Sequence, residues 1–171
     1  MEIDYDYQVI DDFLDPDEFK ELQKNTIYNT HFPWFYNEGI ASLTNTPSLW
    51  DFQFVHSFYS DSLGQSPELK NLTALIEKIN PSRVYRIKAN LNPITDVTRQ
   101  SGWHTDFGDE LVCTTAVFYL NKNNGYTVFK NNERVESVPN RLLMFDSRLE
   151  HAGTSCTDSN FRSVINLNYS A

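Results

Sequence analysis

The chain has 171 residues, of which 40% are hydrophobic and 14% aromatic, and its formal net charge is −9. This length and apolar content suffice for one hydrophobic core, and the low counts of glycine and proline exclude a fibrous or disordered chain. An acidic chain without a stripe of Lys and Arg is a poor binder of phosphate backbones, so nucleic acid is an unexpected partner.

The N-terminal residues are acidic and contain no apolar run of the kind that secretory signals have. No stretch reaches the length of a membrane span. Cys113 and Cys156 are too few for a disulfide framework and are not spaced as a metal-binding pair, so we interpret both as reduced thiols. The sequence therefore indicates a cytoplasmic protein without a membrane partner, and it leaves the oligomeric state open.

Two segments have the pattern of helices. The first begins at the N-cap Asp15, has a proline at its first position, and continues at helical spacing to Ile27. The second begins at Ser66, carries a stripe of Leu and Ile, and ends before Pro81. We expect both helices to support the core.

Much of the remaining chain has strand character. Residues 32–36 and 51–59 are rich in aromatic side chains, and turn signals at 123–125 and 131–132 separate later segments. Short strands at this spacing favour a jelly roll or a sandwich over a parallel sheet. The later expected strands are Arg83–Asn90, Leu111–Leu120, Tyr126–Lys130, Arg134–Val138, Arg141–Phe145 and Arg162–Tyr169.

No repeat, low-complexity tract or linker divides the chain. We therefore expect one domain of the α+β class, mainly β with N-terminal helices. Residues 1–82 would form a helical and aromatic support, and residues 83–171 the jelly-roll core.

His104, Asp106 and His151 form a His-x-Asp…His pattern. In an extended segment, residues two apart project to the same face, so one metal ion can bind both His104 and Asp106. His151 would arrive on a loop over 146–153 that follows an apolar strand. Two imidazoles and one carboxylate hold one face of Fe(II) and leave the opposite positions open. We predict that these three residues bind the metal and carry catalysis.

Arg162 follows His151 by eleven residues and lies in the last expected strand. By strand alternation it shares a polar-leaning face with Val164, Asn166 and Asn168. A guanidinium forms a bidentate clamp on a carboxylate, so Arg162 is a candidate to bind the distal carboxylate of 2-oxoglutarate, with Asn166 also facing the pocket. The four residues together indicate an Fe(II)- and 2-oxoglutarate-dependent oxygenase.

From residue 83 to 169 the chain resembles the Fe(II)/2-oxoglutarate dioxygenases, in particular the small prolyl-4-hydroxylase-like group and similar stand-alone oxygenases of phage genomes. The resemblance implies a double-stranded β-helix, the jelly roll of cupin-like proteins, and for a phage-encoded enzyme action in the host cytoplasm. The motifs that carry it are His104-Thr105-Asp106, the strand Val112–Asn121, Gly125 with Thr127 and Phe129, the run Arg141–Asp146 before His151, and Arg162.

The resemblance also implies roles for further residues. Members use the tyrosine of a Tyr-Leu-Asn run to bind the distal carboxylate of the co-substrate, which here is Tyr119. Members often carry another tyrosine before the His-x-Asp motif, and here Asn90 or Asn92 would replace it. The nucleic-acid dealkylating branch has a second arginine where this chain has Asn168, which argues against nucleobase repair.

The implied reaction hydroxylates an unactivated C–H bond and consumes O₂ and 2-oxoglutarate, with succinate and CO₂ as co-products and ascorbate as a candidate reductant. We expect a prolyl or other peptidyl side chain as substrate first, and a free amino acid or small metabolite second. Residues 31–36 and 92–103 are candidates to wall the substrate pocket.

Two alternatives stay open. The same triad describes a catalytic zinc ion with a bound water, although Arg162 and Tyr119 would then have no necessary task. In a non-catalytic jelly-roll binding module the triad would be coincidental. His31 and His56 lack a carboxylate two residues on, so we interpret them as structural or substrate-side residues.

Overall fold

The computed structural model describes residues 6–39, 50–107 and 111–171. Within these ranges the strands form an eight-stranded sheet, in the order β1-β9-β6-β11-β5-β3-β2 with β4 paired to β3, and a three-stranded sheet β10-β7-β8. The strands are β1 (Tyr7–Ile10), β2 (Phe35–Glu38), β3 (Phe52–Ser60), β4 (Gly64–Gln65), β5 (Arg83–Pro93), β6 (Thr114–Tyr119), β7 (Tyr126–Phe129), β8 (Arg134–Glu136), β9 (Leu142–Asp146), β10 (His151–Gly153) and β11 (Phe161–Ser170).

The first expected helix is confirmed as α1 (Pro16–Asn25), and the side chain of Asp15 accepts a hydrogen bond from the backbone N–H of Asp17. The second expected helix is divided into a 3-10 helix, η1 (Pro67–Leu72), and α2 (Thr73–Ile79). At the junction the Thr73 hydroxyl donates to a carbonyl three residues earlier, at the spacing of a 3-10 turn. In the part of the chain that the structure describes, no helix combines the length and hydropathy needed to cross a bilayer.

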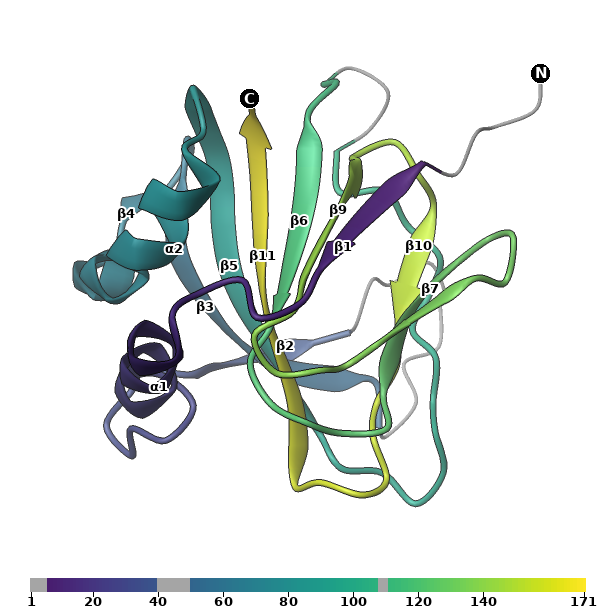
Figure 1. Cartoon of the computed structure of the whole chain (residues 1–171). Helices are drawn as coiled ribbons and strands as arrows, with labels where there is room; N and C mark the ends of the chain where they lie inside the picture. The colour runs from purple at the N-terminus through teal and green to yellow at the C-terminus, as the bar shows by residue number, and fades with distance from the viewer. Residues whose placement is uncertain (1–5, 40–49, 108–110) are drawn as a thin grey trace.

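The large sheet carries an apolar layer on each face. Both helices lie on one side of it (Figure 1), where Leu22 and Leu75 join Ile165 of the central strand in one core. On the other side the large sheet faces the small sheet, and Val164 packs with Phe129 in a second core. The fold is therefore a layer of helices on a two-sheet jelly roll.

The central strand β11 pairs with β5 on one side and with β6 on the other, and both pairings are antiparallel. In this register Asn166 lies opposite Lys88, and Asn168 lies opposite both Arg86 and Thr115. Directly opposed residues share one face of a sheet. The face of β5 and β11 that carries these residues, called the inward face below, is consequently polar, whereas β6 and β9 contribute Val117 and Leu143 to the second core.

The expected mainly β fold with N-terminal helices is confirmed, and each expected strand after residue 83 overlaps an observed strand. Three strands were not expected, among them the two-residue β4. β1 is mostly exposed at the edge of the large sheet and lacks an alternating pattern. β10 lies inside the expected loop 146–153 and has three residues, and its pairing with β7 gives it strand geometry.

Asn140 holds the turn before β9 to the segment before α1. Its side-chain amide accepts from the Leu14 N–H and donates to the Leu14 C=O, both at 2.8 Å, and its φ is +62°. We expect Asn140→Ala to lower the free energy of unfolding by about 2–4 kcal/mol, because two buried backbone groups lose their partners at a strained backbone position.

The control is Asn132→Ala, which has a similar φ of +68° at an exposed position, and for which about 1 kcal/mol is expected. Urea unfolding measures both values. Equal losses in the two variants would contradict the assigned role of the Asn140 amide.

Candidate metal centre

The structure brings His104, Asp106 and His151 together. One ligand atom from each residue lies within 4.8 Å of the others, and the two imidazole ring centroids are 4.5 Å apart. Backbone hydrogen bonds of 3.1 and 3.0 Å pair His104 with His151 in an isolated bridge. The His-x-Asp segment is thus not a full strand, and one antiparallel pair of residues is enough to set the two histidines side by side.

Each imidazole is oriented by a backbone carbonyl two residues before it. Nδ1 of His104 lies 3.1 Å from the Gly102 oxygen, and Nδ1 of His151 lies 2.9 Å from the Leu149 oxygen. A carbonyl can only accept, so Nδ1 carries the proton and Nε2 keeps its lone pair for a metal. Burial lowers the pKa of His151, and the negative charge of Asp106 opposes this shift only in part. His151 is therefore ready to act as a neutral ligand.

Three strands of the large sheet hold the carboxylate of Asp106. Arg86 on β5 donates to Oδ1 at 2.7 Å, while Thr115 on β6 and Asn168 on β11 donate to Oδ2 at 2.6 and 2.9 Å. Burial alone would raise the pKa of this carboxyl group. Its neighbours His151 and Arg86, together with the hydrogen bonds, outweigh burial and lower the pKa to about 2. Asp106 is therefore ionised across the physiological pH range.

The sequence did not predict these three supporting residues as partners of Asp106. Arg86 and Asn168 are also joined to each other by a 3.1 Å hydrogen bond. The only available signal was their shared inward face on neighbouring strands, which requires knowledge of the strand pairing. Asn168 stands where the dealkylating branch has arginine, and here its amide orients the carboxylate of Asp106.

The donor set fits a ferrous ion. Two neutral imidazole nitrogens and one ionised carboxylate converge from one side, as in sites that leave positions open for other ligands. Each donor has its orientation fixed by a further hydrogen bond, as metal ligands in proteins have.

Arg162 is a buried cation without an acidic partner. Its side chain donates from Nε to Ser137 Oγ at 2.9 Å and from Nη2 to Thr127 Oγ1 at 3.1 Å. No carboxylate of the described residues forms an ion pair with it, although the residue is only 3% exposed. Burial lowers its pKa. Because an unpaired buried charge costs several kcal/mol, this guanidinium marks a place for an anion.

Tyr119 lies beside this guanidinium, with the Arg162 Cζ 5.7 Å from its ring centroid. Its hydroxyl donates to Thr127 Oγ1 at 2.8 Å. Thr127 therefore accepts from both Tyr119 and Arg162, and its own hydroxyl proton is left to donate. The sequence analysis had noted Thr127 only as part of a motif, and the structure places it between the two expected anion-binding residues.

Two glycines make room for the Arg162 side chain. A Cβ atom on Gly125 would lie 2.7 Å from Arg162 Cδ, closer than two carbon atoms can approach, and one on Gly153 would lie 3.4 Å from Nη1. Both positions belong to the small sheet or its edge. The small sheet consequently closes over Arg162 while leaving the guanidinium its space.

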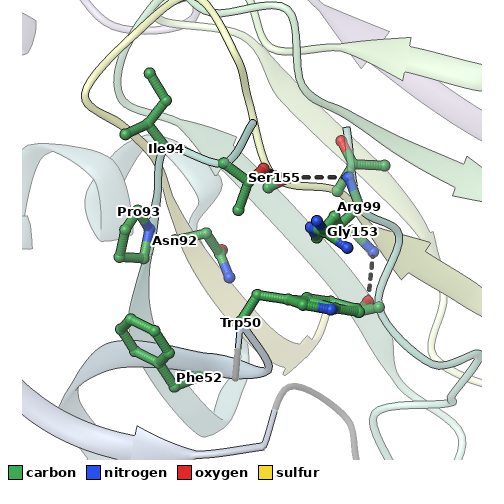
Figure 2. A pocket seen from close by; sticks show the side chains of 11 residues that line it. Trp50, Phe52, Asn92, Pro93, Ile94, Arg99, Gly153 and Ser155 are labelled. Carbon is green, nitrogen blue, oxygen red and sulfur yellow. Dashed lines mark hydrogen bonds between the residues drawn. The ribbon is translucent and has the colours of Figure 1, made fainter. Parts of the chain in front are cut away.

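A cavity of about 180 Å³ borders this region. Trp50 and Phe52 lie on one side of it, and Asn92 points into it from β5 (Figure 2). Asn92 is also the strand partner of Arg162, so the cavity adjoins the anion site. Of the two segments expected to line a substrate pocket, residues 92–103 line this cavity. Residues 31–36 do not line it, and Trp34 packs against the core beneath the helices. The cavity has room for a few water molecules or one small side chain.

The remaining expected residues have distinct surroundings. The Oδ1 atoms of Asn90 and Asn166 are buried, and neither has a hydrogen-bond partner among the described atoms. His56 is a structural residue, since its ring nitrogens lie 2.8 Å from the Pro33 oxygen and 2.9 Å from Ser66 Oγ. His31 is exposed and lies outside the triad.

No protein-family model matches this sequence, and no curated protein matches it either. Solved structures do. An oxidoreductase of the 2OG-Fe(II) oxygenase family from Burkholderia pseudomallei has a TM-score of 0.70 at 10% identity, over 96% of this chain and 84% of its own. A Pseudomonas putida prolyl-4-hydroxylase has a TM-score of 0.64 at 13% identity, over 98% and 93%.

A prolyl hydroxylase from Trichoplax adhaerens, solved with a peptide fragment of the hypoxia inducible factor oxygen degradation domain, has a TM-score of 0.64 at 17% identity. The match covers 95% of this chain and 82% of that one. At these identities the likeness establishes the fold. The chain has the jelly-roll fold of the 2-oxoglutarate/Fe(II) oxygenases, as the sequence led us to expect.

Thr115→Val tests how the Asp106 carboxylate is held. The substitution removes the 2.6 Å hydrogen bond while keeping the side-chain volume, and we expect the affinity for Mn(II) or Co(II) to fall by about tenfold or more. Isothermal titration calorimetry measures the affinity. Thr114→Val is the control, because its side chain lies on the opposite face of β6. Equal affinities for the parent and Thr115→Val would contradict the assignment.

The pH dependence of metal binding is a second test. Metal ligation requires neutral imidazoles and an ionised carboxylate, and the pKa of Asp106 is already lowered to about 2. We expect the affinity to fall as the pH drops and protons compete for His151, and because burial lowers the pKa of His151 this fall should lie below the ordinary histidine range of about pH 6.5. An affinity that stays level down to about pH 4 would show that carboxylates alone hold the ion.

Proposed function

We propose that this chain is an Fe(II)- and 2-oxoglutarate-dependent dioxygenase that hydroxylates an unactivated C–H bond. The observation that carries the proposal is the combination of a converging His-Asp-His triad with one buried guanidinium that lacks an acidic partner among the described residues. The shared fold with 2-oxoglutarate/Fe(II) oxygenases supports it.

In this proposal His104, Asp106 and His151 hold the iron through Nε2, a carboxylate oxygen and Nε2. Iron with 2-oxoglutarate and O₂ supplies the oxidation of C–H to C–OH, and 2-oxoglutarate leaves as succinate and CO₂. The protein orients the reactants and excludes water. Hydrogen bonds to both oxygens of Asp106 keep its carboxylate in a fixed position relative to the imidazoles.

Arg162 would bind the distal carboxylate of 2-oxoglutarate through Nη1, the guanidinium nitrogen that has no recorded hydrogen bond within the described residues. Thr127 would add its hydroxyl proton, and Tyr119 would fix the position of Thr127. A carboxylate there neutralises the buried cation, which turns an unfavourable charge into binding energy. In a zinc hydrolase or a non-catalytic module, the buried guanidinium of Arg162 would have no anionic ligand to bind.

For the substrate we propose a prolyl or other peptidyl side chain, or a small amino-acid-like molecule, with O₂ as co-substrate. The cavity beside Asn92 has aromatic and polar walls that suit one side chain. We further propose a single domain over residues 1–171, activity in the cytoplasm, and ascorbate as the reductant that maintains ferrous iron.

We expect His104→Ala and Asp106→Ala to abolish conversion of 2-oxoglutarate to succinate, because each removes a metal ligand. Arg162→Gln should raise the 2-oxoglutarate concentration needed for half-maximal rate by about tenfold or more, since a charge-assisted contact is lost. Succinate release measured over a range of 2-oxoglutarate concentrations gives both results. Asp17→Ala, at an exposed position of α1, is the control.

Parent-like turnover in the two ligand variants would overturn the proposal. So would parent-like 2-oxoglutarate dependence in Arg162→Gln. Circular dichroism spectra of all four variants identify any loss that is due to misfolding.

A further inference from the structure

Lys88 lies on the inward face of the large sheet and takes no part in the proposed metal or co-substrate sites. It follows Arg86 by two residues on β5, so both side chains project to the same face. Across the pairing with β11 it lies opposite Asn166, and across the pairing with β3 it lies opposite Ser57. An ammonium group therefore stands in the wall beside the metal centre.

This ammonium group has no counter-ion in the part of the chain that the structure describes, and no hydrogen bond to it is recorded there. Lys88 is only partly exposed, and burial together with the positive charge of Arg86 lowers its pKa, although the negative charge of Asp106 opposes this shift in part. Arg86 is neutralised by Asp106, and Arg162 would be neutralised by 2-oxoglutarate. Lys88 is left as a second cation without an ion pair among the described residues, and a bound anion would neutralise it.

Two hydrogen-bond acceptors flank Lys88. The Oδ1 atoms of Asn90 and Asn166 are buried without a partner among the described atoms. Asn90 is the next inward residue of β5, and Asn166 is directly opposite Lys88 on β11. Buried acceptors are normally satisfied, so a ligand that covers Lys88 must also bring N–H or O–H donors.

These three residues are adjacent to the iron-binding carboxylate. Arg86 and Asn168 both contact Asp106. Lys88 is two residues from Arg86 on β5, and Asn166 is two residues from Asn168 on β11. Residues two apart in a strand are separated by about 7 Å along it. A small molecule bound over Lys88 would therefore place its side chain close to the metal.

Building on the proposed dioxygenase activity, we propose that Lys88, Asn90 and Asn166 form the binding site for the charged backbone of a free α-amino acid. The ammonium group of Lys88 binds the α-carboxylate, and the two amide oxygens accept from the α-ammonium group. A residue inside a peptide carries neither charge, so it cannot neutralise the Lys88 ammonium group, and it offers one backbone N–H for two amide oxygens. Of the two substrate classes proposed above, this site therefore selects the small amino-acid-like molecule, as a free amino acid, over the peptidyl side chain.

The test compares two substrate pools that have the same side chains. One contains free L-amino acids and the other contains their N-acetyl amides, which lack both backbone charges. Each is incubated with protein, Fe(II), ascorbate and 2-oxoglutarate, and mass spectrometry detects the addition of one oxygen atom. We expect a product from the free amino acids and none from the amides.

The variant Lys88→Met keeps the length of the side chain and removes its charge. We expect roughly a tenfold or larger loss of turnover at subsaturating amino acid, with 2-oxoglutarate binding to the Fe(II) protein unchanged. Lys88→Arg should recover part of the lost turnover, because it restores the charge. Lys20→Met, at an exposed position of α1, is the control and should behave as the parent.

Oxidation of the amides alone, of neither pool, or equal turnover by Lys88→Met and the parent would overturn this inference. A loss of 2-oxoglutarate binding in Lys88→Met would also overturn it, since Lys88 would then serve the co-substrate. These results are distinct from failure of the proposed function. In that case the parent itself would neither bind 2-oxoglutarate with Fe(II) nor release succinate, and both proposals would fall.

Discussion

The candidate metal centre depends on the hydrogen bonds that hold the buried carboxylate of Asp106. Arg86, Thr115 and Asn168 reach it from three neighbouring strands of the large sheet, while the imidazoles come from the bridge between His104 and His151. This carboxylate therefore fixes the segment around residue 104 to the large sheet. The orientation of its two oxygens follows from strand pairing, so the geometry of the triad is a property of the whole sheet.

The same antiparallel alternation distributes charge along the inward face. The outward side chains of β11 pack in the core beneath the helices. Its inward side chains, from Arg162 to Asn168, lie at the centre of the sheet. Two cations without acidic partners in the described chain, Arg162 and Lys88, thus face the interior of a protein whose net charge is −9. A negative overall charge disfavours polyanions as partners, while the two inward cations carry the proposed sites for small carboxylates.

The fold class and the His-x-Asp pair could be predicted because their signals are local. An N-cap at Asp15, alternation within strands, and the pair His104 and Asp106 can each be identified in a few consecutive residues. The partners of Asp106 could not, because Arg86 and Asn168 lie 20 and 62 residues away and meet it only through strand register. The co-substrate roles expected for Tyr119, Asn90, Asn92 and Asn166 stay predictions. For Asn90 and Asn166 the proposed amino-acid site would replace that role.

The account stands on one ferrous ion and one 2-oxoglutarate molecule sharing this site. Anaerobic titration of the Fe(II)-loaded protein with 2-oxoglutarate tests that claim most directly, because chelation of ferrous iron by the keto acid gives a visible charge-transfer band. We expect the band to saturate at one 2-oxoglutarate per chain and to be absent in Asp106→Ala. A parent protein that binds iron but develops no band, or an Asp106→Ala variant that develops the same one, would contradict the account.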